Sequence, residues 1–209
     1  DPFTEDIIYG PKYSYVIIDE KSIKNQMVEI SQKIALDVST FDQYACSSPH
    51  TIFVKTKDEK IISDFSNSLS KAMENVERIL LPKVKETEEK SNEIISTRSE
   101  YEIKGKVISP KNLSWTVIVS NEEGFAQPTF SRVIHVRPYT EKSVMLKDNR
   151  KIQSIGIAIN DEERFDLVDK ITFFGGDRCP PLGKMSFFDS PWDGMFGMDR
   201  MVRWITTYK

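Results

Sequence analysis

The chain has 209 residues, of which 39% are hydrophobic and 29% charged, enough for one sizeable hydrophobic core or two small ones. Its 29 Lys and Arg residues against 32 Asp and Glu give a net charge of −3, so the basic excess that holds a nucleic-acid backbone is missing and no nucleic-acid partner is expected. Apolar runs such as Val16–Ile18 are far shorter than the roughly 20 residues that cross a bilayer. We therefore expect neither a membrane span nor a signal peptide.

Two cysteines, Cys46 and Cys179, are too few for a disulfide framework in a chain of this size. They predict a reducing, cytoplasmic compartment. The chain opens with Asp1–Thr4, which resembles a cloning linker. We expect residues 5–209 to be a domain excised from a longer protein.

The first half of the chain alternates between strand and helix patterns. β-Branched and aromatic residues predict a strand over Tyr13–Ile18, and Asp19 then opens a helix. A loop over Ser39–Pro49 carries Cys46 and leads into a second strand, Thr51–Val54. The helix that follows Asp19 has one apolar face, made of Ile23, Met27, Ile30 and Ile34.

The remaining elements complete an alternating pattern. An amphipathic helix is predicted over Asp58–Leu81, ended by Pro82, and a charged, solvated helix over Lys83–Arg98. A last helix, Asp161–Lys170, has Asn160 as its expected N-cap. Three short apolar runs predict buried strands: Trp115–Val119, Val133–Val136 and Ile155–Ile159. Strands alternating with helices favour an α/β domain with the sheet between helical layers.

Common phosphate and metal motifs are missing. No Gly-x-Gly-x-x-Gly or Walker sequence follows a predicted strand, so no nucleotide phosphate is expected to bind by those routes. The two histidines, His50 and His135, are far apart in the sequence, and we expect no dedicated metal site. Cys46 is the best chemical candidate, because its loop can hold a side chain rigidly and still leave it open to a substrate. The alternative is that Cys46 is a small buried apolar residue.

Several segments carry a resemblance to known enzymes. The order of Ile8–Asp19, a helix, Cys46, Thr51–Val54 and a long helix is similar to the aldehyde dehydrogenase segment that leads from a Glu-Leu-Gly-Gly-Lys motif to the nucleophilic cysteine. The acyl-CoA reductases of the bacterial luminescence system resemble this chain more closely. That resemblance is carried by Phe41–Pro49, His135–Pro138, Gly176–Met185 and Asp189–Gly194.

The resemblance implies a three-layer α/β/α catalytic domain like that of aldehyde dehydrogenases, with the nucleotide-binding domain largely outside this chain. It implies that the Cys46 thiolate attacks a fatty acyl-CoA or acyl-protein and forms an acyl-enzyme, which NADPH then reduces to a fatty aldehyde. The backbone N–H groups of Cys46 and Ser47 are the expected oxyanion donors. An acyl-transferase, a fatty-acid synthetase subunit and further copies of the protein are the implied partners.

Two positions depart from the aldehyde dehydrogenase pattern. The Glu that activates hydrolytic water falls at Ile8, whose side chain can take no proton. This departure suits an enzyme that reduces its acyl intermediate instead of hydrolysing it. The Glu that holds the nicotinamide ribose falls at Pro128, so ribose binding in this family pattern is in doubt.

Four other side chains have competing interpretations. His50 is either an auxiliary base for Cys46 or a surface group, and His135 is interpreted as a hydrogen-bonded core histidine. Cys179 is interpreted as part of a structural turn, in spite of the adjacent Arg178. Trp192 lies either near a substrate channel or in an ordinary packed turn.

Two other functions remain open from the sequence. One is a cysteine acyltransferase or thioesterase that uses no dinucleotide and would need an acid or base near Cys46. The other is a non-catalytic interaction domain that docks through Lys83–Arg98.

Overall fold

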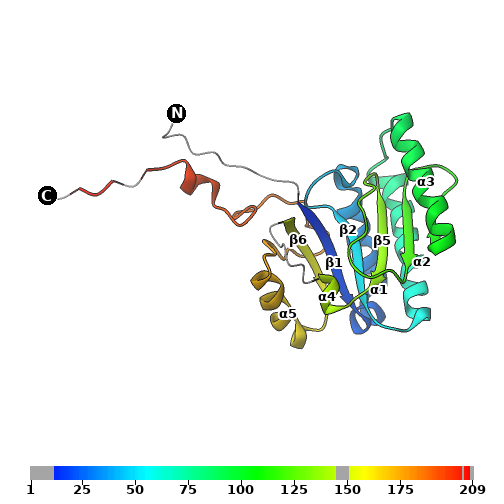
Figure 1. Cartoon of the computed structure of the whole chain (residues 1–209), viewed down its shortest axis with the longest axis horizontal. Coiled ribbons are helices and arrows are strands. Elements are labelled where there is room, and N and C mark those ends of the chain that lie inside the picture. The colour runs from blue at the N-terminus through cyan, green and yellow to red at the C-terminus, as the bar shows by residue number, and fades with distance from the viewer. Residues whose placement is uncertain (1–11, 145–150, 204, 208–209) are drawn as a thin grey trace.

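A six-stranded sheet forms the centre of the molecule, in the strand order β3-β4-β5-β2-β1-β6 (Figure 1). The computed structural model describes residues 12–144, 151–203 and 205–207. The expectations for residues 1–4 and for Ile8 lie outside these ranges. All neighbouring strands are parallel except β3, which pairs antiparallel with β4. The strands are β1 (Tyr13–Asp19), β2 (Pro49–Lys55), β3 (Gly105–Ile108), β4 (Thr116–Ser120), β5 (Val133–Pro138) and β6 (Ile152–Ala158).

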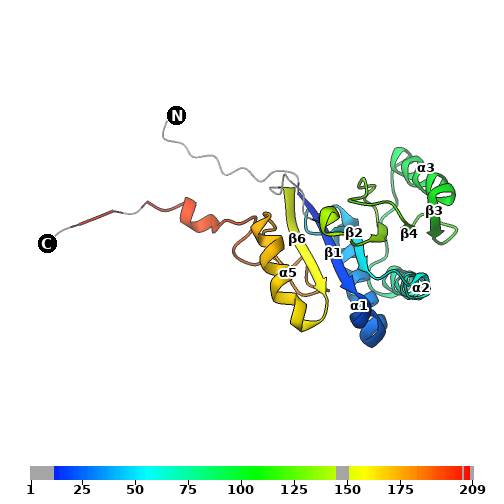
Figure 2. The ribbon, with the colours of Figure 1, turned by 60° about the horizontal axis from the view of Figure 1, so that its bottom comes forward.

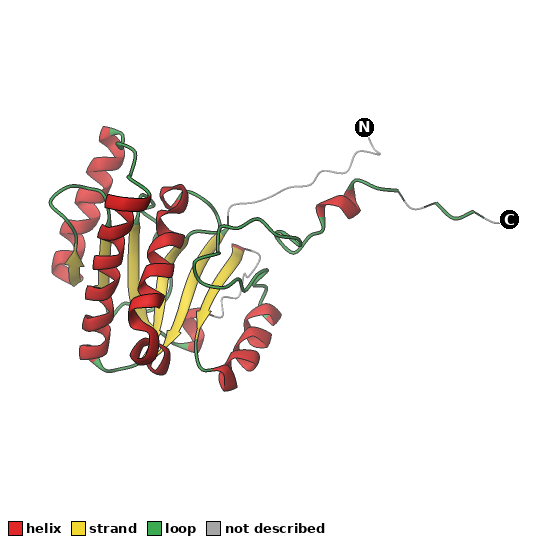
Figure 3. Ribbon diagram, turned by 180° about the vertical axis from the view of Figure 1, so that it is seen from behind, coloured by secondary structure: helices red, strands yellow, loops and turns green. Residues whose placement is uncertain are grey.

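Helices cover both faces of this sheet, as Figures 2 and 3 show. One face packs against α1 and α2 through the largest apolar cluster. On the other face α3 covers β4 and β5, while α4 and α5 lie over the side that contains β1 and β6. The helices are α1 (Glu20–Ser39), α2 (Glu59–Asn75), α3 (Glu88–Lys104), α4 (Glu141–Val144) and α5 (Asp161–Phe173). The predicted three-layer α/β/α architecture is therefore confirmed.

Carboxylate caps fix the starts of the two helices on the first face. Asp19 accepts a hydrogen bond from the Ser22 N–H at 2.7 Å, and Asp58 accepts one from the Lys60 N–H at 2.9 Å. Each cap satisfies an N–H group that has no partner within its helix. The predicted apolar faces are buried in both helices, and in α2 they continue into a π-helical turn over Val76–Leu80.

The prediction for the charged helix was wrong at both ends. The helix α3 begins after Thr87, whose hydroxyl accepts from the Lys90 N–H at 3.2 Å, and it continues to Lys104. Residues 83–87 are irregular because Lys83 turns inward to reach backbone carbonyl groups. The helix is also not fully solvated, since Ile94 and Tyr101 are buried against β4 and β5.

Two smaller features also differ from the sequence interpretation. The strand β3 was not predicted. A side chain at its Gly105 would place a Cβ only 2.2 Å from the carbonyl oxygen of Val119, so this close pairing requires glycine. Asn160 stands at the N-cap of α5, but its side chain does not cap the helix and instead accepts from the Lys21 ammonium at 3.1 Å.

Beyond Gly194 the chain leaves the sheet (Figure 1). Large apolar side chains are exposed along this segment: Phe196, Met198, Met201, Val202 and Ile205. Within the described residues, no helix combines the length and apolar character needed to cross a membrane.

His135 lies in the core on β5, with only 2% of its surface exposed. Its core position is confirmed, but neither ring nitrogen has a hydrogen-bond partner among the described residues, so the expected hydrogen bonding is not found. Burial lowers the pKa of His135 to about 3, with Arg137 and His50 adding to the effect. The folded chain therefore holds this imidazole neutral, whereas the unfolded chain protonates it near pH 6.5.

We expect His135→Phe to flatten the dependence of stability on pH. For a lowered histidine pKa, stability is present above the unfolded value and is lost as the pH falls below it. When the pH falls from 7.5 to 5, protonation of His135 in the unfolded state should lower the free energy of unfolding of the wild-type protein by about 2 kcal/mol. The variant should not show this loss. Urea unfolding at the two pH values measures this difference, and an equal pH dependence in both proteins would contradict it.

Candidate active site

Cys46 lies in the loop that joins α1 to β2, at the amino edge of the sheet. It is half-buried. Its carbonyl oxygen accepts a hydrogen bond from the Ser14 hydroxyl at 2.7 Å, and that hydroxyl accepts one from the Ser154 N–H at 3.1 Å. Among the described residues, the N–H groups of Cys46 and Ser47 have no acceptor. The Cys46 loop is thus held through its carbonyl oxygen. The backbone N–H groups of Cys46 and Ser47 make no hydrogen bond to the described residues.

A second segment, Arg178–Phe187, packs against this loop. The Ser47 hydroxyl lies 3.2 Å from that of Ser186. The Arg178 guanidinium donates to the carbonyl oxygens of Phe187 at 2.9 Å and Met185 at 3.4 Å. These contacts fix a cation near the Cys46 loop.

The environment of Arg178 combines burial with nearby negative charge. Burial lowers the pKa of its guanidinium, and the charges of Asp189, Asp193 and the Cys46 thiolate counteract this effect. Its guanidinium also lies 4.3 Å from the ring centre of Trp192. The Arg178 guanidinium is therefore close enough to Cys46 for the two groups to interact electrostatically.

A buried carboxylate anchors the second segment to α1. Asp37 is 2% exposed, and its two oxygens accept from the N–H groups of Gly183 at 2.6 Å and Met185 at 2.9 Å. Burial raises the pKa of Asp37 to about 6, although the two hydrogen bonds counteract part of the effect. Asp37 was not predicted from the sequence as part of the site. Its position one turn after the buried Ile34 places it on the buried face of the helix, which could have indicated a structural role.

Two short turns with left-handed backbone conformation stand at the amino ends of β2 and β5. Residues 41–43 have φ angles of 55°, 50° and 68°, and residues 130–132 have 58°, 57° and 62°. None of them is glycine, so each carries a steric cost of roughly 1–2 kcal/mol. Such conformations persist only where the surrounding contacts hold them.

The side chain of Gln43 joins the two turns. It is fully buried, and its amide NH₂ donates to the carbonyl oxygens of Pro49 at 2.8 Å and Val133 at 2.9 Å. Its carbonyl oxygen accepts from the Val133 N–H at 2.9 Å. One side chain therefore ties the start of the Cys46 loop to the first residues of both strands.

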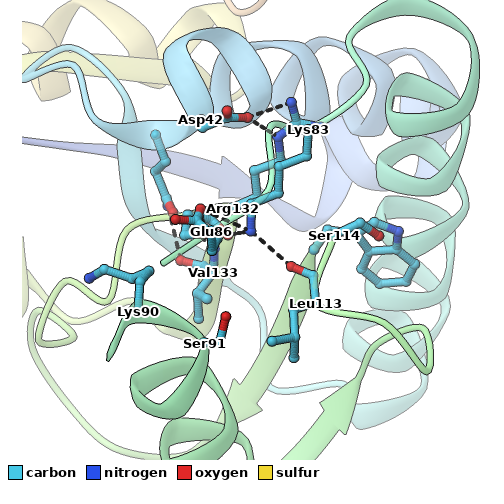
Figure 4. A network of polar contacts seen from close by, with 12 residues as sticks. Asp42, Lys83, Glu86, Lys90, Ser91, Leu113, Ser114, Arg132 and Val133 are labelled. Atoms are coloured by element: carbon cyan, nitrogen blue, oxygen red, sulfur yellow. Dashed lines mark hydrogen bonds and ion pairs between the residues drawn. The ribbon is translucent and has the colours of Figure 1, made fainter. Parts of the chain in front are cut away.

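Arg132 makes the second connection between the turns (Figure 4). Its guanidinium donates from Nε to Asp42 at 2.6 Å and from Nη1 to Glu77 at 2.7 Å. Lys83 lies beside this group and donates to the carbonyl oxygens of Leu113 at 2.8 Å and Ser131 at 3.1 Å. Burial lowers the pKa of Lys83, while the charges of Glu86 and Asp42 counteract the effect.

The family model for acyl-CoA reductase (LuxC) matches residues 1–204. The chain belongs to this family. A search of curated protein sequences gave no significant match.

Solved structures show the same fold at low sequence identity. A γ-glutamyl-γ-aminobutyraldehyde dehydrogenase from Burkholderia cenocepacia J2315 is 11% identical, with a TM-score of 0.63 over 82% of this chain and 38% of that one. A 1-pyrroline-5-carboxylate dehydrogenase from Thermus with bound NAD is 14% identical, with a TM-score of 0.58 over 84% and 36%. The LuxC-family chain thus has an aldehyde dehydrogenase fold and spans little more than a third of each of these proteins.

His50 has a different environment from Cys46 in this LuxC-family chain. It is 4% exposed on β2, and its ring packs edge-on against Phe130 at 5.0 Å. Burial lowers the pKa of His50 to about 4, so the imidazole is neutral and a weak base at pH 7. No hydrogen bond joins it to Cys46 within the described ranges. Its auxiliary role stays a prediction.

Cys179 lies in the segment that packs on the loop, and Trp192 follows that segment in the chain. Burial raises the pKa of Cys179 to about 11, so this thiol is neutral at physiological pH. Trp192 closes a short turn with Met195 and stacks on Phe188 at 4.9 Å. A cavity of about 570 Å³ opens along residues 177–191, and Cys46 is not among its lining residues.

The described residues contain no glycine-rich phosphate loop of the Gly-x-Gly-x-x-Gly type. No group of three His, Cys, Asp or Glu side chains in this part of the chain is arranged to hold a metal ion.

Replacing Asp37 with Asn should loosen the segment that covers the loop. An amide oxygen can accept one of the two N–H bonds, but the NH₂ group would face the other N–H and leave it without an acceptor. We expect a loss of about 1–3 kcal/mol in unfolding free energy and faster hydrogen exchange at the amides of Gly183 and Met185. Glu29→Gln, an exposed change on the same helix, is the control. Equal exchange in both variants would contradict this role.

Proposed function

We propose that this chain is the cysteine-bearing part of an enzyme that reduces a long-chain fatty acyl-CoA or acyl-protein to a fatty aldehyde. The observation that carries the proposal is the half-buried Cys46, held in a fixed loop beside amide donors without acceptors. The LuxC-family match and the aldehyde dehydrogenase fold support the same reaction class.

The first step is acyl transfer to Cys46. The thiolate attacks the thioester carbonyl carbon, a new C–S bond forms, and the negative charge moves to the former carbonyl oxygen. The N–H groups of Cys46 and Ser47 donate to this oxygen, each contributing roughly 3 kcal/mol when well aligned. The tetrahedral intermediate then breaks its bond to the donor sulfur, which leaves as a thiolate and takes a proton from solvent.

The second step requires hydride from a nicotinamide cofactor, and NADPH is the cofactor that we propose. We propose that this cofactor is bound mainly by a part of the enzyme outside this chain, and the lack of a glycine-rich phosphate loop among the described residues supports this. The contribution of this chain is to hold the acyl group as a thioester in a fixed orientation.

The same proposal extends to partners and location. We propose that the acyl group comes from an acyl-transferase acting with a fatty-acid synthetase subunit, that the enzyme is a homo-oligomer, and that it works in the cytoplasm. The family resemblance and the two free thiols support these assignments.

The thioesterase alternative is weakened by the position of His50. A hydrolase would need a base to activate water at the acyl-enzyme. His50 directs its ring toward Phe130, and its lowered pKa of about 4 makes it a poor proton acceptor at pH 7. The interaction-domain alternative is weakened because part of its expected docking surface, Lys83–Arg98, is buried inside the fold and is not exposed to a partner.

Intact mass measurement after incubation with tetradecanoyl-CoA tests the proposed function. We expect one tetradecanoyl group on the wild-type protein and on Cys179→Ser, because the Cys179 thiol is neutral. Cys46→Ala should carry none. Continuous release of free fatty acid without an adduct would favour the thioesterase, and neither adduct nor release would favour the interaction domain.

A further inference from the structure

The buried guanidinium of Arg132 is bound by two carboxylates from different parts of the fold. Arg132 is 2% exposed, while the side chains of Asp42 and Glu77 are 20% and 22% exposed. A buried cation is stable only when it is paired and hydrogen-bonded. Arg132 meets this requirement by linking the turn before Cys46 to the π-helical turn that ends α2.

The shape of the guanidinium matters here as well as its charge. Nε and Nη2 both point to the same Asp42 oxygen, and Nη1 points to Glu77. A planar fork fixes the relative position of two acceptors, which a lysine ammonium does not. Arg132 thus sets where Asp42 lies with respect to α2.

The position of Asp42 in turn determines how the chain enters the Cys46 loop. Asp42 is the middle residue of the left-handed turn over residues 41–43, and the next residue, Gln43, is bonded to Pro49 and Val133. Residues 44–48 then span two fixed points, the turn and the first residue of β2. The directions of the N–H groups at Cys46 and Ser47 depend on these two anchors, together with the Ser14 hydroxyl that holds the Cys46 carbonyl oxygen.

We propose that Arg132 is a positioning residue for Cys46: it holds Asp42, keeps the left-handed turn in place, and so aims the oxyanion-binding N–H groups. This inference rests on the proposed function of Cys46. Residues 130–132 adopt the same conformation at the adjacent strand, so the guanidinium that holds one strained turn belongs to the other. Each turn therefore depends on the other for its geometry.

The test compares two reactions of the same thiol in the full chain. Acylation of Cys46 by tetradecanoyl-CoA builds an oxyanion and needs the aimed N–H groups. Alkylation by iodoacetamide occurs at a saturated carbon and builds none. The ratio of the two rates therefore reports the positioning of the amides rather than access to the thiol.

Asp42→Asn is the main variant, because Asn tolerates the left-handed conformation while it removes the charge that binds Arg132. Arg132→Lys keeps the charge and removes the fork. Asp64→Asn is the control, because it removes an exposed carboxylate that pairs with Lys60 on α2.

We expect acylation to fall about tenfold or more in Asp42→Asn and Arg132→Lys, with alkylation within about twofold of the wild type and both rates unchanged in Asp64→Asn. If Arg132→Lys does not fold, the result for Asp42→Asn is by itself the test of the positioning role. The positioning role alone would be overturned if the wild-type chain acylates and the variants acylate equally well. It would also be overturned if the variants lose acylation and alkylation in the same proportion. A wild-type chain that never acylates would overturn the proposed function and this inference with it.

Discussion

The reversal of the chain between α1 and β2 is the constraint on which the site depends. Helix α1 ends at the amino edge of the sheet, and residues 40–48 must turn the chain back into a parallel strand. The turn is made with three consecutive left-handed residues, and neighbouring β5 begins in the same way. Gln43 and Arg132 offset this cost through bonds that cross between the turns. The conformation of the Cys46 loop therefore depends on the pairing of two strained segments that are far apart in the sequence.

This arrangement puts Cys46 at the amino edge of a parallel sheet, whereas open α/β sheets commonly bind ligands at the carboxyl edge. The carbonyl end of α1 also meets this edge, and the negative end of a helix dipole disfavours an anion there. Arg178 supplies opposite charge beside the loop, held by backbone carbonyl oxygens and by the ring of Trp192. The positive charge beside this loop is thus supplied by a side chain rather than by a helix terminus.

The sequence predicted those parts of the fold that local patterns determine. Helices α1 and α2 were predicted from their caps, Asp19 and Asp58, and from the apolar faces that follow them. All five parallel strands were predicted from short β-branched runs. The start of α3 could not be predicted, because Lys83 is turned inward by carbonyl groups of Leu113 and Ser131, which are distant in the sequence. Cys46 was proposed from its loop and its family resemblance, whereas Arg132 was not, because an arginine before a strand has no local signature. Its role exists only once Asp42 and Glu77 are placed around it.

The borders of the sheet have a consequence for how copies of this protein can associate. One border ends in β3, a four-residue strand that runs against its neighbour and carries the exposed Lys106. At the other border the main chain at Arg178 bridges to Ser154 and occupies part of the free edge of β6. Short, charged or covered borders resist the addition of a strand from a second molecule. A strand from a second molecule would therefore meet a short charged strand at one border and a partly occupied edge at the other.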